Sequence, residues 1–154
     1  VYAEVAGYGM AHKAVAFGRL DGSEEALVDA VRLAAEDAGM KLDEIDAIVG
    51  FGNGDADTDS LELDAYRKLF GGKLASLPVF TVKDTTGEGR AASASLSAAH
   101  AALMLSDKYE LAGRAYKLQA DKMVQTTVDT KALKNVLITS YGVGGSYCAV
   151  IIKR

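Results

Sequence analysis

One stretch of the sequence, residues 77–100, constrains the fold of this chain more than any other. It opens with the apolar run Leu77–Val82, which follows a Gly-Gly pair and has the character of a buried strand. Lys83 and a polar turn over residues 84–89 come next. A run of alanine and serine without internal glycine or proline then predicts a helix. Its small side chains let other backbones approach closely, so we expect a central helix packed on all sides. In α/β folds ligands bind where strands end and helices begin, so Lys83 and the turn are expected to face a site.

The other apolar runs predict the rest of a mixed sheet. Val1, Ala3 and Val5 alternate with polar residues, as in a strand, and the run at 47–49 is expected to be a buried strand. Two further strand runs, at 136–141 and 147–152, flank a turn with three glycines and predict an antiparallel hairpin.

Two amphipathic helices are expected between these strands. The first covers residues 24–38, with Ser23 as its N-cap and Gly39 as its terminating residue. The second covers residues 61–70, before another glycine pair. Residues 109–133 are weakly periodic and are expected to form helix or extended loop. The order β-α-β-α-β-α-β-β then gives an α/β fold: a five-stranded mixed sheet with helices on its faces, in three layers.

Composition excludes several classes of protein. A chain of 154 residues can bury the core of one domain, and it contains no apolar run long enough for a membrane span. A net charge of −4 with scattered lysines argues against a nucleic-acid partner. The single cysteine, Cys148, rules out an internal disulfide and favours a reducing, cytoplasmic setting. The histidines, cysteine and carboxylates lack metal-ligand spacing, so we expect neither a metal nor another cofactor. The acidic loop at 50–59 lacks the pattern of a calcium-binding loop and is interpreted as a solvated turn.

Several blocks of sequence, in order along the chain, resemble the C-terminal half of the β-ketoacyl-acyl-carrier-protein synthases, which have the thiolase fold. The blocks are the opening YAEVAGYGM, the glycine corner at 50–54 with Asp59 and Glu62 beyond it, the Lys-x-x-Thr-Gly unit at 83–87, and SYGVGG at 140–145. In that family the catalytic cysteine belongs to the N-terminal half. The resemblance therefore implies that residues 1–154 are one C-terminal thiolase-like domain, half of a larger ketosynthase-like protein.

The chain departs from the family at the catalytic positions. Active condensing enzymes of this type use two histidines from this half, and these positions fall on Phe51 and Glu88. The family's lysine is retained as Lys83, while Val143 replaces a gating phenylalanine. Condensation needs donors that stabilise an enolate and a thioester oxyanion, and imidazole supplies them. Phe51 has no donor and an ionised Glu88 repels an enolate. The loss of one such donor typically costs about 10²–10³ in rate.

These departures resemble the chain-length factors of type II polyketide systems, which pair with an active ketosynthase and shape the tunnel for the growing chain. The resemblance implies an acyl carrier protein, a ketosynthase partner or second copy, and an N-terminal thiolase-like half as partners. The alternative is an active ketosynthase or other thioester enzyme with an altered site that uses Lys83 and Glu88. A third option is a small acyl-binding or carrier-docking module. Lys83 and Glu88 are the catalytic candidates, although a structural ion pair is the interpretation we favour for them. Substrate contacts are implied at Phe51, Gly52, Thr86, Gly142, Val143 and Gly144.

Overall fold

The computed structural model describes residues 1–16, 24–106 and 114–154. The strands are β1 (Glu4–His12), β2 (Ala47–Val49), β3 (Val79–Phe80), β4 (Ala115–Gln119), β5 (Lys122–Thr126), β6 (Asn135–Gly142) and β7 (Ser146–Lys153). The α-helices are α1 (Glu24–Asp37), α2 (Ala56–Phe70), α3 (Lys83–Thr86) and α4 (Ser93–Leu105). Short 3₁₀ turns lie at Leu42–Glu44, Gly71–Ala75, Arg90–Ala92 and Thr130–Ala132. The expected N-cap Ser23 lies outside the described residues.

The described strands form one mixed sheet in the order β1-β7-β6-β2-β3-β4-β5. Its centre is parallel, because β2 pairs in parallel with both β6 and β3. Antiparallel pairs flank that centre on both sides: β6–β7 and β7–β1 on one, β3–β4 and β4–β5 on the other. The carboxyl ends of β2 and β3 therefore lie side by side, and the loops that follow them are neighbours.

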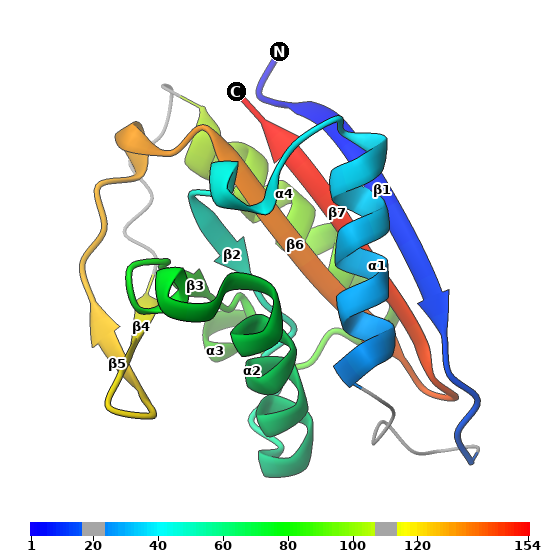
Figure 1. The fold of residues 1–154 in the computed structure, drawn as a ribbon. Helices are drawn as coiled ribbons and strands as arrows, with labels where there is room; N and C mark the ends of the chain where they lie inside the picture. Colours follow the sequence, from blue (N-terminus) through cyan, green and yellow to red (C-terminus); the bar gives the residue numbers. More distant parts are fainter. Residues whose placement is uncertain (17–23, 107–113) are drawn as a thin grey trace.

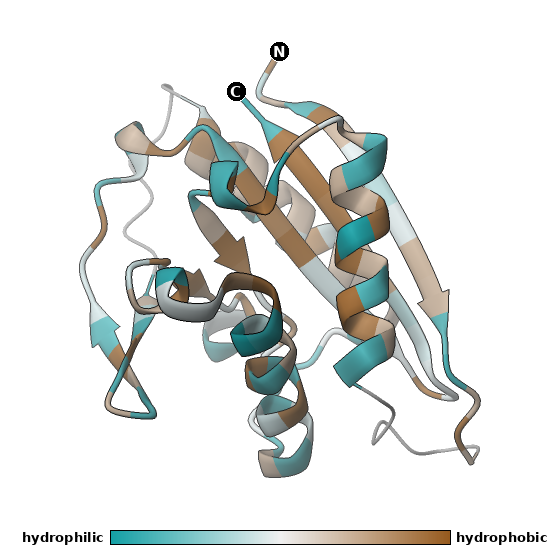
Figure 2. Cartoon of the chain, viewed as in Figure 1, coloured by the Kyte–Doolittle hydropathy of each residue, from teal (hydrophilic) through white to brown (hydrophobic). Residues whose placement is uncertain are grey.

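Helices cover both faces of this sheet, so the three-layer α/β arrangement is confirmed. In Figure 1, α1 and α2 lie on the near face and α4 lies on the far face. Two separate apolar clusters fill the layers: Ile48 and Leu137 belong to the α1–α2 cluster, while Val49, Val136 and Ile138 belong to the α4 cluster. Alternate residues of β2 and β6 thus point into opposite cores. Figure 2 shows the apolar residues concentrated on these central strands and on β7.

The prediction of five strands was wrong, since the described residues contain seven. The two extra strands, β4 and β5, form a hairpin within residues 109–133, where helix or extended loop was expected. Residues 107–113 lie outside the described part of the chain. The hairpin extends the sheet beyond β3 and provides a wall for the site described below.

Helix α1 packs against β1 at unusually short range. Gly7 and Gly9 of β1 lie directly under it, and a Cβ atom at Gly9 would come within 2.2 Å of the Ala30 carbonyl oxygen. Only glycine allows this approach, so the opening YAEVAGYGM block places its glycines where the helix crosses the strand.

Helix α4 forms from the predicted alanine and serine run but is packed on one side only in this chain. Ser97, Ala101 and Met104 are buried against the sheet, whereas Leu96 is 40% exposed. The expectation of a helix packed on all sides is thus not met within these residues. Among the described helices none has both the length and the apolar character needed to cross a membrane.

Candidate functional site

The loop after β2 is held in place by a buried carboxylate. Glu62 projects from α2 and accepts hydrogen bonds from the backbone N–H groups of Phe51 (2.8 Å) and Gly52 (3.0 Å). It also accepts from the hydroxyls of Tyr66 (2.6 Å) and Thr139 (2.7 Å). Burial, followed by the neighbouring Glu62 charge, raises the pKa of Tyr66 well above its ordinary value. The phenol therefore stays protonated and donates, and the loop is fixed against the sheet.

The Phe51 ring lies between an aromatic ring and a cation. It stacks on Tyr141 with ring centroids 4.1 Å apart, and the Lys83 ammonium lies 3.0 Å from its centroid on a ring face. Phe51 is 8% exposed and the Lys83 side chain is equally well buried. The aromatic face partly compensates the ammonium for lost water through a cation–π interaction.

Lys83 also forms the ion pair with Glu88 that the sequence allowed for, with Nζ and Oε2 2.8 Å apart. Lys83 begins α3, separated by two residues from the end of β3, and Glu88 follows the Gly87 cap of the same short helix. The Glu88 carboxylate additionally accepts from the Ser93 hydroxyl (2.7 Å) and from the Arg90 backbone N–H. Partial burial would raise the pKa of Glu88, but the bonds from Lys83 and Ser93 outweigh it and lower that pKa. Glu88 is therefore an anion at neutral pH.

Phe51, Tyr141, Lys83 and Glu88 form the centre of the candidate site. The other residues predicted for the site lie on the turns that adjoin these four in the sequence. Gly142 ends β6, and Val143 and Gly144 lie in the turn to β7, where Val143 is 56% exposed and Gly144 has a φ of +98°. Tyr141 precedes Gly142 on β6, so its stack with Phe51 brings the SYGVGG block to the loop after β2. The Thr86 hydroxyl donates within its own turn, to the carbonyl oxygens of Val82 and Gly87. The structure thus joins three of the sequence blocks, while the hydrogen bonds of the Thr86 hydroxyl stay within its own turn.

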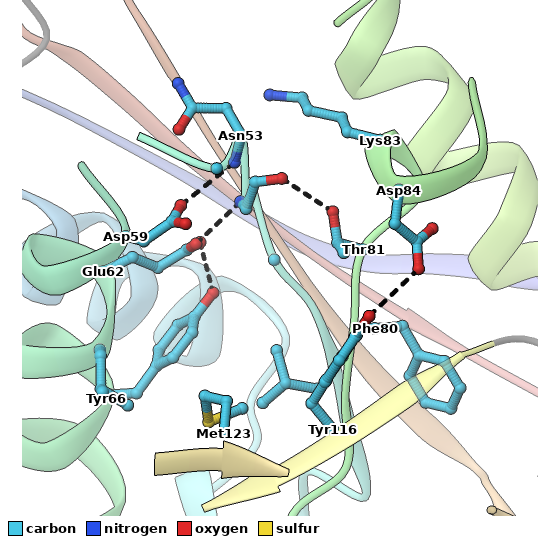
Figure 3. A pocket seen from close by; sticks show the side chains of 15 residues that line it. Asn53, Asp59, Glu62, Tyr66, Phe80, Thr81, Lys83, Asp84, Tyr116 and Met123 are labelled. Carbon is cyan, nitrogen blue, oxygen red and sulfur yellow. Dashed lines mark hydrogen bonds between the residues drawn. The ribbon is translucent and has the colours of Figure 1, made fainter. Parts of the chain in front are cut away.

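A cavity of about 350 Å³ opens beside this centre, between α2, β3 and the β4–β5 hairpin. Figure 3 shows Asn53, Asp59 and Glu62 on one side of it and Thr81 and Asp84 on the other. Asp59 accepts from the Asn53 backbone N–H (3.1 Å), and desolvation raises its pKa above the ordinary aspartate value. Sequence reasoning missed this cavity, because its outer wall comes from the unexpected hairpin. It also assigned no role to Tyr141, although that residue lies within the SYGVGG block.

In the described part of the chain, no three histidine, cysteine or carboxylate side chains are grouped so that they could hold a metal ion. Cys148 lies half-buried on β7, where desolvation raises the pKa of its thiol. A raised pKa disfavours the reactive thiolate at neutral pH.

Comparison with known proteins agrees with this geometry. The family model described as the beta-ketoacyl synthase C-terminal domain matches residues 2–112, and the chain belongs to this family. It is 28% identical over 99% of its length to a polyketide beta-ketoacyl synthase of Streptomyces virginiae, of which it covers 37%. It is 26% identical over its whole length to a 3-oxoacyl-[acyl-carrier-protein] synthase 2 of Coxiella burnetii, of which it covers 38%. The chain therefore spans well under half the length of these relatives.

Solved structures share the fold. A type II polyketide ketosynthase, in complex with its acyl-carrier protein and bound to the hexaketide, superposes with a TM-score of 0.85 at 21% identity. The ishigamide ketosynthase/chain length factor superposes with a TM-score of 0.78 at 23% identity. Each comparison covers 99% of this chain and 38% of the other. The thiolase-like α/β fold expected from the sequence is thereby confirmed.

Proposed function

We propose that this chain is the C-terminal half of a ketosynthase-like subunit that has no condensing activity of its own and shapes the acyl-chain tunnel of an active ketosynthase partner. The observation that carries the proposal is the occupied centre of the site. Phe51 lies where the family's first histidine is expected, buried between Tyr141 and Lys83. It fills that position and offers no hydrogen-bond donor to an enolate or oxyanion.

The charges of the centre support the same conclusion. Lys83, the one retained member of the family's set in this half, is paired with Glu88 and covered by the Phe51 ring. Its ammonium is thus already neutralised by an anion at the second histidine position. A developing negative charge would have to displace Glu88 from the ion pair. Two lost donors at about 10²–10³ each leave little condensation rate for the subunit alone.

We further propose that a second thiolase-like half completes the protein. Tyr8 and Met10 of β1 are each 62% exposed, and Leu96 of α4 is exposed as well. Such apolar side chains are suited to an interface. The length of the relatives supports a preceding half. The expected partners are an acyl carrier protein and a ketosynthase, or a second copy of this protein, in the cytoplasm.

The proposal is tested by reconstitution. Full-length protein is combined with its co-encoded ketosynthase, the acyl carrier protein and malonyl thioester, and product length is read by mass spectrometry. Val143→Phe places a larger side chain at the exposed β6–β7 turn and would narrow the proposed tunnel there. It is expected to shift the products toward shorter chains. Val124→Phe, at another exposed valine (39% against 56% for Val143) on the β4–β5 hairpin, is the control and leaves them unchanged. An unchanged product distribution when the protein is omitted would contradict the proposal.

A second candidate function is an enzyme with an altered thioester site. It is favoured by the 41% exposure of the Glu88 side chain, which leaves this carboxylate accessible from solvent beside the buried Lys83. In that case full-length protein alone turns over acyl thioesters, and Glu88→Gln abolishes turnover. Glu25→Gln, an acidic residue in the first turn of α1, serves as the control and leaves turnover intact.

A further inference from the structure

The cavity beside the centre has an apolar body. Its walls come from α2, β3 and the β4–β5 hairpin, and Figure 3 shows Met123 on the side away from Asn53 and Lys83. The apolar and aromatic side chains that line it are Leu63, Tyr66, Val79, Phe80, Tyr116 and Met123. A volume of about 350 Å³ lies within the range of roughly 300–1,000 Å³ typical of small-molecule sites. Walls of this kind bind hydrocarbon through the hydrophobic effect.

The outer wall lies outside the residues that the family model matches. The family model ends at residue 112, and Tyr116 and Met123 lie beyond it on β4 and β5. The Tyr116 hydroxyl lies 3.5 Å from the Asp84 carboxylate, which brings the hairpin to the segment that carries Lys83. The hairpin thus closes a space that begins at the candidate site.

The polar groups of the cavity select against anions. Asp59, Glu62 and Asp84 line it with Lys83 as their cationic neighbour, and Lys83 is already paired with Glu88. Glu62 is saturated by its four hydrogen bonds. A free carboxylate or phosphate would meet uncompensated negative charge at this rim, whereas a neutral group would not.

We propose that this cavity binds the hydrocarbon part of a neutral acyl group and that Met123 limits how much of it enters. The assignment to an acyl chain rests on the proposed function; the preference for a neutral apolar ligand rests on the walls and charges alone. The growing chain would then be measured inside this subunit's own fold, between α2 and the hairpin.

Binding is tested with 1-octanol on full-length protein carrying ¹³C-methyl methionine. The chain has four methionines, and the Met123 signal is assigned as the one lost in Met123→Leu. Octanol is expected to shift the Met123 methyl resonance and to leave unchanged that of Met104, which is 1% exposed in the α4 cluster and does not line the cavity. Octanoate, which has a similar chain and a negative charge, is expected to bind more weakly. An unmoved Met123 resonance, or equal binding of octanoate, would overturn the inference.

A filled cavity provides the second test. Met123→Trp is expected to weaken octanol binding about tenfold or more and to shorten the products of the reconstituted system. Val124→Trp is the matched control: Val124 is 39% exposed against 37% for Met123, and as the next residue of β5 it points to the other face. Octanol binding without any change in product length would overturn the acyl-chain assignment. Octanol binding by a protein that also condenses alone would uphold the cavity and refute the proposed function, so the two failures are distinguishable.

Discussion

The hydrogen bonds at Glu62 predict that this residue is the main support of the loop that carries Phe51. Glu62 is 5% exposed and accepts from two backbone N–H groups and two hydroxyls. In Glu62→Ala the Tyr66 and Thr139 hydroxyls still have each other, because their oxygens lie 2.6 Å apart. The N–H groups of Phe51 and Gly52 lose their acceptor. A buried donor left unsatisfied costs about 1–3 kcal/mol, so the two together predict a destabilisation of roughly 2–6 kcal/mol.

Urea unfolding of wild type and variant measures this cost as a lower midpoint with an unchanged slope. Hydrogen exchange provides the local check: the Phe51 and Gly52 amides are expected to lose protection, while amides of β6 keep theirs. Asp64→Asn is the control on the same helix, because Asp64 is exposed and its ion pair is with Arg67, three residues on. That change should stay within about 0.5 kcal/mol of wild type. A loss below about 1 kcal/mol in Glu62→Ala, with amide protection intact, would refute the assignment.

Two further predictions concern packing and pH. Gly9→Ala is expected to lower the free energy of unfolding by at least about 1–3 kcal/mol in thermal unfolding, because its Cβ would overlap the Ala30 carbonyl. Gly72→Ala, with open space around it, should be neutral. Equal stabilities of the two variants would contradict the close contact between α1 and β1. The lowered pKa of Glu88 makes its contribution to folding fully present above the unfolded-state value of about 4.5 and progressively lost as the pH falls through the lower folded-state value. The urea midpoints of wild type and Glu88→Gln should therefore differ near neutral pH and converge in acid, and a gap that persists in acid would contradict the ion pair with Lys83.

The central strands and helices of the fold could be predicted because their patterns are strong. The run at 47–49 is strand β2 as expected, and α1 and the β6–β7 hairpin also follow their predicted ranges closely. The β4–β5 hairpin could not be predicted, because its turn residues, Ala120 and Asp121, both have positive φ. Two-residue hairpin turns with positive φ normally contain Asn-Gly or another glycine, which makes them recognisable in a sequence. Here the sequence contains no such signal, and β5 is too exposed to show alternation.

The candidate site was predictable in its parts but not in its contacts. Family-like spacing located Phe51, Lys83 and Glu88. The opposite charges of Lys83 and Glu88 were enough to suggest the ion pair between them. The stack of Phe51 on Tyr141 depends on the pairing of β2 with β6 in the sheet. No local sequence pattern predicts how close these two rings come. The cavity escaped prediction for the same reason, since it requires the register of β4 on β3.

The most direct test of the central claim is whether the full-length protein, without a partner, decarboxylates and condenses malonyl thioesters on the acyl carrier protein. Carbon dioxide release and covalent acyl-enzyme are followed by mass spectrometry, with an active ketosynthase as the positive control. We predict neither signal from the protein alone, and a changed product length when the ketosynthase is added. Turnover by the protein alone, lost in Lys83→Met or Glu88→Gln, would contradict the account and identify the pair as catalytic.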